Sequence, residues 1–131
     1  MPTTLLNQLT PVMVVDRVEP CIAFWVDRFG FTAENEMPGP DGALVFASAR
    51  NGAVEVMYQT TASVLAETPA MQDELRGHSI TLFIQVSDFE ATERALAGAE
   101  VVKPRHQTFY GSTEMYVREP GGNLVGFARF A

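Results

Sequence analysis

Hydrophobic and polar positions in the first half of this chain follow two periods, one typical of strands and one typical of a helix. An apolar stripe at helical spacing predicts a helix from about Val18 to Phe29, with Asp16 as a possible cap and Gly30 at its end. Asn51-Gly52 is a strong hairpin signal. Runs rich in β-branched and aromatic residues predict four strands, at 9–16, 31–37, 43–49 and 53–59.

The second half has the same order of elements. Ser87 to Glu90 forms a capping-box pattern, which predicts a helix running to about Ala97. Pro104 interrupts one of the apolar runs and therefore places that strand at a sheet edge. Four strands are predicted here as well, at 79–87, 100–107, 113–118 and 124–130.

A constant offset relates the two halves. Asp16 and Asp88 both stand at strand-to-helix junctions, and Asn51 and Asn123 both stand in strand-to-strand turns, each pair 72 residues apart. This offset indicates an internal repeat. We expect one domain, residues 1–131, with repeat one at about 5–60, repeat two at about 78–131 and a connector at 61–77 that is partly helical. The predicted fold is α+β, with two βαβββ repeats forming facing curved antiparallel sheets around a groove. The alternative is a plain two-layer domain with coincidental offsets.

Composition narrows the possible partners. The 131 residues are 47% hydrophobic and carry a net charge of −7, with only nine Lys and Arg. Nucleic-acid and anionic membrane binding need clustered basic residues, so neither is expected. No apolar run approaches the length of a membrane span, and the first residues lack a signal-peptide pattern, so we expect a cytoplasmic protein. Cys21 is the single cysteine and is expected to be a small core residue.

Two segments carry a resemblance to a known group of proteins. The segment AFWVDRFGF (23–31) and the hairpin EMYVREPGGN (114–123) resemble the vicinal oxygen chelate superfamily, which includes glyoxalase I, extradiol dioxygenases and bleomycin resistance proteins. The Phe-Trp-Val-Asp and Gly-Phe pieces look especially like bleomycin resistance proteins. The resemblance implies the paired βαβββ fold and a homodimer whose clefts lie between subunits. It does not fix the activity, since this scaffold supports many chemistries.

The enzymes of this superfamily bind a divalent metal through four strand residues. By position, the resemblance puts these ligands at Leu9, Glu55, Leu82 and Gly126, of which only Glu55 has a metal-binding side chain. One-residue slips in that alignment do not rebuild the set, because they bring in Gln8, Thr10, Thr81, Phe83, Val125 or Phe127. We therefore expect no metal and no other cofactor.

Strand alternation identifies candidates for the lining of the groove. In the last hairpin, Glu114, Tyr116 and Gly126 fall on one face. Leu9, Pro11 and Met13 share a face of the first strand, and Leu82 and Ile84 share one of the fifth. The main ligand-binding candidates are Phe46, Glu55, Met57, Tyr110, Glu114, Tyr116 and Gly126. The alternative is that the Met and Phe residues among them only fill the core.

The function these observations favour is a metal-free protein of the bleomycin-resistance type, which sequesters a small molecule such as a cationic or aromatic antibiotic. One alternative is a divergent glyoxalase- or dioxygenase-like enzyme that uses Glu55 with an incomplete metal site, or Glu55 or His106 as a base. Another is a structural or regulatory module with a filled groove. His78 and His106 lack a partner at metal-ligand spacing, so a surface role is expected for each. The sequence leaves the identity of the ligand open.

Overall fold

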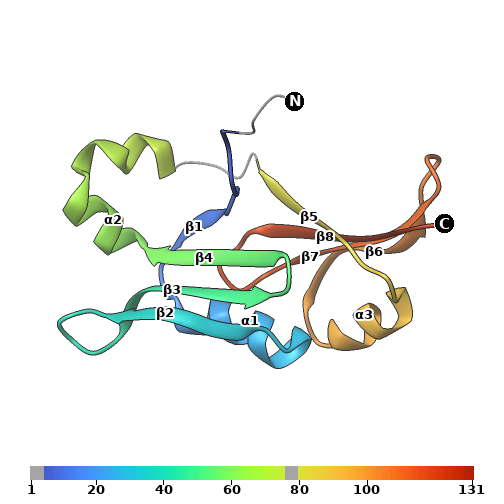
Figure 1. Ribbon diagram of the computed structural model, residues 1–131, viewed down its shortest axis with the longest axis horizontal. Coiled ribbons are helices and arrows are strands. Elements are labelled where there is room, and N and C mark those ends of the chain that lie inside the picture. Colours follow the sequence, from blue (N-terminus) through green and yellow to red (C-terminus); the bar gives the residue numbers. More distant parts are fainter. Residues whose placement is uncertain (1–4, 76–79) are drawn as a thin grey trace.

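The chain folds into two halves with the same strand order, as the computed structural model shows for residues 5–75 and 80–131. In Figure 1 the first half lies on the left and the second on the right, with α1 and α3 on the same side of the molecule. Sheet A has the order β1-β4-β3-β2 and sheet B the order β5-β8-β7-β6. The elements of sheet A and its helix are β1 (Val12–Val15), α1 (Glu19–Phe29), β2 (Thr32–Pro38), β3 (Leu44–Asn51) and β4 (Val54–Thr60).

A helical connector, α2 (Thr61–Glu67) and the 3₁₀ helix η1 (Pro69–Leu75), follows the first half. The elements of the second half are β5 (Thr81–Gln85), α3 (Phe89–Ala95), β6 (Glu100–Gln107), β7 (Ser112–Arg118) and β8 (Leu124–Phe130). All eight predicted strands and both predicted helices are present. The part of the chain that the structure describes has no helix long and apolar enough to span a membrane.

Both sheets are mixed, whereas the sequence led us to expect antiparallel ones. β1 pairs with β4 and β5 pairs with β8 in parallel, and the other neighbouring strands are antiparallel. The connectivity explains this. α1 returns the chain so that β2 runs in the same direction as β1, and two tight turns then bring β4 into that direction as well.

Helix starts differ slightly from the predicted ones. The N-cap of α1 is Val18 and has no side-chain hydrogen bond, so Asp16 does not cap this helix. Glu19 and Pro20 occupy the first turn of α1. The amide that Pro20 lacks would have no partner within the helix, and the negative charge of Glu19 interacts favourably with the positive end of the helix dipole. In α3 the cap is Asp88, which accepts a hydrogen bond from the Ala91 amide, and Ser87 lies one residue earlier.

The two sheets share one core through the faces that carry α1 and α3. Phe29 of α1 stacks on Phe127 of β8 with ring centroids 5.4 Å apart. Trp25 donates to the Tyr58 hydroxyl (2.9 Å), and that hydroxyl donates to the Glu119 carboxylate (2.7 Å) in the turn between β7 and β8. All three side chains are buried, where an unpaired polar group would be costly. These hydrogen bonds therefore help to hold the two halves together.

The opposite faces of the sheets therefore point away from the shared core. We call the side of sheet A that carries Glu55 face A, and the side of sheet B that carries Glu114 face B. Paired residues in neighbouring strands lie on the same side, so Met57 and Phe46 belong to face A, and Tyr116 and Gly126 belong to face B. The hollow described below is lined by the second half alone.

Candidate functional site

Face A centres on Glu55, whose two carboxylate oxygens both have partners. One oxygen accepts hydrogen bonds from Gln8 (2.7 Å) and Thr10 (3.2 Å). The other lies 2.8 Å from the Arg50 guanidinium, which also approaches Glu34 at 3.5 Å. Glu55 is only 9% exposed, so the cation is needed to offset the loss of hydration.

These contacts correct the predicted position of the first metal ligand. Leu9 is 91% exposed, and it is Gln8 and Thr10 that reach Glu55. The pairing of β1 with β4 also shows that the side of β1 predicted to line the groove faces the core instead. Met13 pairs with Tyr58 and is buried in the shared core, so it does not line face A.

Of the third and fourth predicted ligand positions, Gly126 lies on face B but Leu82 does not, because β5 pairs with β8 one residue away from the expected register. Phe83, and not Leu82, lies opposite Gly126. Leu82 and Ile84 pack against the core, so their predicted place in the groove is wrong. The parallel pairing of β5 with β8 fixes which side each residue faces, and the local sequence does not reveal that pairing.

The ring of Tyr116 leaves no room for a side chain at Gly126. A Cβ atom built on Gly126 would lie 2.5 Å from Cε2 of Tyr116, far inside van der Waals contact. Tyr116 is also the cross-strand partner of Gly126, so its ring lies across the position where a metal-binding side chain would project.

The residues at the second, third and fourth positions do not fit a divalent metal. Glu55 is engaged by Arg50, Phe83 has no lone pair to donate, and the ring of Tyr116 covers Gly126. Within residues 5–75 and 80–131, no three His, Cys, Asp or Glu side chains are grouped so that they could hold a metal ion.

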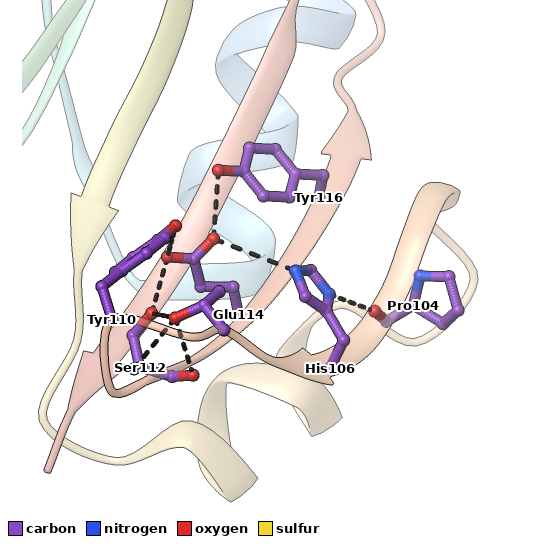
Figure 2. Close-up of polar contacts among 7 residues, drawn as sticks. Pro104, His106, Tyr110, Ser112, Glu114 and Tyr116 are labelled. Atoms are coloured by element: carbon purple, nitrogen blue, oxygen red, sulfur yellow. Dashed lines mark hydrogen bonds and ion pairs between the residues drawn. The ribbon is translucent and has the colours of Figure 1, made fainter.

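Face B centres on a second buried carboxylate, Glu114, which is held by hydroxyl groups (Figure 2). One oxygen accepts from Tyr110 (2.7 Å) and Ser112 (2.7 Å), and the other accepts from Tyr116 at 3.2 Å. Glu114 is 1% exposed. Three neutral donors replace the water that burial removes, without a guanidinium such as the one beside Glu55.

The hydroxyls set the ionisation of this cluster. Burial raises the pKa of Glu114, but the hydrogen bonds from Tyr110, Ser112 and Tyr116 outweigh it and leave that pKa below its usual value of 4.5. The hydrogen bond to Glu114 raises the pKa of Tyr110, and burial followed by the charge of Glu114 raises the pKa of Tyr116. At neutral pH the carboxylate is therefore charged and both phenols are neutral donors.

His106 joins this cluster, contrary to the surface role predicted for it. Between Lys103 and His106 the pairing of β6 with β7 slips by one residue, so that Lys103 pairs with Tyr116 and His106 with Glu114. Pro104 lies in this bulge and has no amide proton to donate to the ladder. The extra residue turns His106 onto face B, where its Nε2 lies 4.0 Å from a Glu114 oxygen. The proline inside a strand segment was the sequence signal for this.

The cluster lines an open hollow of about 580 Å³. The ring of His106 stacks on that of Tyr116 with centroids 6.3 Å apart. The exposed ring of Phe109 meets the ring of Tyr110 edge-on, with centroids 5.1 Å apart. Charged side chains at the hollow are few, namely Lys103, which is exposed, and Glu114, which is buried. The lining residues are Val102, Lys103, His106, Gln107, Thr108, Phe109, Tyr110, Glu114, Tyr116 and Leu124.

The predicted ligand-binding residues thus separate into two groups. Tyr110, Glu114, Tyr116 and Gly126 come together on face B, whereas Phe46, Glu55 and Met57 lie on face A. Sequence reasoning missed Ser112 and Phe83 as members of face B. His78 lies outside the described residues.

Cys21 is a core residue, as predicted. It is 1% exposed, and burial, aided by the charge of Glu119, raises the pKa of its thiol to about 12. A thiol that stays protonated at neutral pH is a poor nucleophile, so Cys21 does not contribute a reactive group.

Comparisons with known proteins agree with this architecture. An uncharacterised protein of Mycobacterium bovis is 32% identical over 118 residues, covering 88% of this chain and 78% of the relative. A glyoxalase/bleomycin resistance protein/dioxygenase family enzyme from Burkholderia phytofirmans superposes with a TM-score of 0.76 at 18% identity, covering 93% of this chain and 97% of that one. TioX from Micromonospora superposes with a TM-score of 0.71 at 23% identity, covering 95% and 99%.

These two structural likenesses concern the fold alone. The sequence profile of the Glyoxalase/Bleomycin resistance protein/Dioxygenase superfamily matches residues 6–127, which is nearly the whole chain. It follows that this protein belongs to the glyoxalase/bleomycin resistance protein/dioxygenase superfamily.

Proposed function

We propose that this chain is a metal-free binding protein of the bleomycin-resistance type, which sequesters a small molecule against the aromatic floor of face B. One observation carries the proposal. The ring of Tyr116 lies across Gly126, at the position that corresponds to the last metal ligand of the superfamily's enzymes. A surface built in this way offers stacking area and a buried carboxylate in place of a Lewis acid.

We further propose a homodimer in which face A of one protomer covers face B of its partner. Large apolar side chains on these faces support this, since Val12 is 49%, Phe83 46% and Phe130 42% exposed in the single chain. Such a dimer would bring the two separated groups of predicted ligand-binding residues into one groove. Analytical ultracentrifugation tests it, and a monomer at micromolar concentration would contradict it.

The first experiment is a metal and ligand titration. The purified protein is offered Mn, Fe, Co, Ni and Zn, and bound metal per chain is determined after gel filtration. We expect well below one metal per chain, and we expect stoichiometric binding without turnover when bleomycin and related amphipathic antibiotics are titrated. Near-stoichiometric metal that is lost in Glu55→Ala would overturn the proposal.

The competing function is a divergent enzyme that uses Glu55. The Arg50 guanidinium lies 2.8 Å from one Glu55 oxygen, and Gln8 and Thr10 donate to the other, so both oxygens are already engaged, which argues against metal binding and against action as a base. Glyoxalase and dioxygenase assays test this alternative. Activity that disappears in Glu55→Gln would favour the enzyme. A filled interaction module would instead show no rise in melting temperature with any ligand.

A further inference from the structure

The floor of the hollow holds two hydrogen-bond acceptors that face each other. Nδ1 of His106 lies 2.8 Å from the carbonyl oxygen of Pro104. A carbonyl only accepts, so Nδ1 carries the proton, and in the neutral ring Nε2 carries a lone pair. That Nε2 lies 4.0 Å from Oε1 of Glu114, which is also an acceptor (Figure 2).

Oε1 of Glu114 is the less occupied oxygen of the carboxylate. It accepts a single hydroxyl bond, from Tyr116 at 3.2 Å, while Oε2 accepts two bonds of 2.7 Å from Tyr110 and Ser112. A carboxylate oxygen can accept two hydrogen bonds, so Oε1 has capacity for one more donor. The neutral imidazole cannot supply it, because its proton is on the far nitrogen.

The separation of the two acceptors suits one nitrogen placed between them. A nitrogen at about 2.9 Å from both atoms, a normal hydrogen-bond length, would see them at an angle of roughly 90°. Two N–H bonds of a primary ammonium, amidinium or guanidinium group can serve both acceptors at that angle. The charge of Glu114 favours such a cation over a neutral amide.

The surroundings specify the rest of the ligand. The ring of His106 stacks on Tyr116, and Tyr110 and Phe109 line the same hollow, so a flat apolar body can lie beside the cation. Lys103 is the one cation among the lining residues, and its exposed side chain can extend into solvent. It weakens the attraction for a cation without blocking the pair.

We propose that Nε2 of His106 and Oε1 of Glu114 form a clamp for an N–H-bearing cationic group of a planar ligand. The clamp rests on the proposed binding function and names the ligand class that the site selects. It assigns to His106 a contact role that depends on its fixed tautomer and on the bulge at Pro104.

Two matched probes test the clamp, 2-naphthamidine and 2-acetylnaphthalene, which share a ring system and differ in the cationic N–H group. Binding is measured by calorimetry or naphthalene fluorescence at about pH 8, where imidazole is neutral. We expect the intact protein to bind the amidine at least tenfold more tightly than the ketone, as charge-assisted hydrogen bonds predict. Equal affinities would overturn the clamp.

Three variants locate the effect. His106→Phe keeps a ring beside Tyr116 but removes Nε2, so the amidine should lose roughly tenfold in affinity while the ketone is unchanged. Glu114→Gln should also weaken amidine binding, and Lys103→Met should strengthen it a few-fold by removing a like charge. The two charge changes are thus expected to shift amidine affinity in opposite directions. Damage to the fold would weaken binding in both variants, so it could not produce this result. Unchanged amidine affinity in His106→Phe would overturn the clamp even if Glu114→Gln folds poorly.

The outcomes also separate the clamp from the proposed function. If the ketone binds as well as the amidine, the aromatic groove stands and the clamp fails. If neither probe binds and bleomycin does not bind either, both ideas fail.

Discussion

Faces A and B solve the same problem, a carboxylate buried in the middle of a sheet, in different ways. On face A the Arg50 guanidinium lies 2.8 Å from Glu55 and neutralises it within the chain. On face B three hydroxyls hold Glu114, and they add no charge. The first arrangement satisfies the carboxylate on its own. The second keeps a negative charge available at the edge of a hollow.

The corresponding strands β4 and β8 show a second contrast. β4 carries Glu55 on face A, whereas β8 carries Gly126 under the ring of Tyr116. The two halves therefore share one strand order, while the chemistry of their faces differs. Four substitutions break or sharpen this contrast.

The largest effect is expected from giving β8 the carboxylate that β4 has. Gly126→Glu forces a side chain into the ring of Tyr116 and adds a charge near Glu114, so it should lower the free energy of unfolding by about 3 kcal/mol. Urea denaturation measures this. Adding Tyr116→Ala should restore part of the loss, and no restoration would mean that the ring is not what excludes a side chain at Gly126.

Glu114→Gln comes next, with an expected loss of about 2 kcal/mol at pH 7, because the buried Ser112 hydroxyl and the half-exposed Tyr110 hydroxyl lose a charged acceptor. Since the folded pKa of Glu114 is lowered, its contribution is present above the ordinary value of 4.5 and is lost as pH falls through the folded pKa. Denaturation of both proteins as a function of pH should thus show the difference shrinking in acid. A constant difference would indicate that ionisation of Glu114 does not stabilise the fold.

Arg50→Met tests how much the ion pair between Arg50 and Glu55 on face A stabilises the fold. We expect a loss of about 1 kcal/mol, less than for face B, because Arg50 is 39% exposed and its ion pair is partly screened by water. The comparison is made by urea denaturation at low and high salt. Persistence of the full effect in 1 M salt, where the Debye length is about 3 Å, would show that packing of the Arg50 side chain matters more than its charge.

Tyr116→Phe should have the smallest effect, about 0.5 kcal/mol, because it removes one long hydrogen bond and keeps the ring over Gly126. It also serves as the matched control for Tyr116→Ala, which removes the ring. Thermal unfolding separates the two. If both variants lose the same stability, the hydroxyl and not the ring is the important part of Tyr116.

Local sequence determined much of this protein. Every strand and both main helices follow from apolar periodicity, and Asn51-Gly52 places the hairpin of β3 and β4, with Gly52 at a φ of +59° that glycine adopts without strain. Alternation placed Glu114, Tyr116 and Gly126 on one face, because the tight turn between β7 and β8 fixes their register. Each of these features depends on residues close together in the chain.

Only the tertiary structure decided the rest. The faces of β1 and β5 depend on parallel pairing with strands more than 40 residues away, so Met13, Leu82 and Ile84 were assigned to the wrong side. The bulge at Pro104 reversed the direction of His106, a change that strict alternation cannot predict. The hydrogen bonds from Gln8 and Thr10 to Glu55 also join residues more than 40 positions apart, and such residues meet only because the fold brings the start of the chain beside β4.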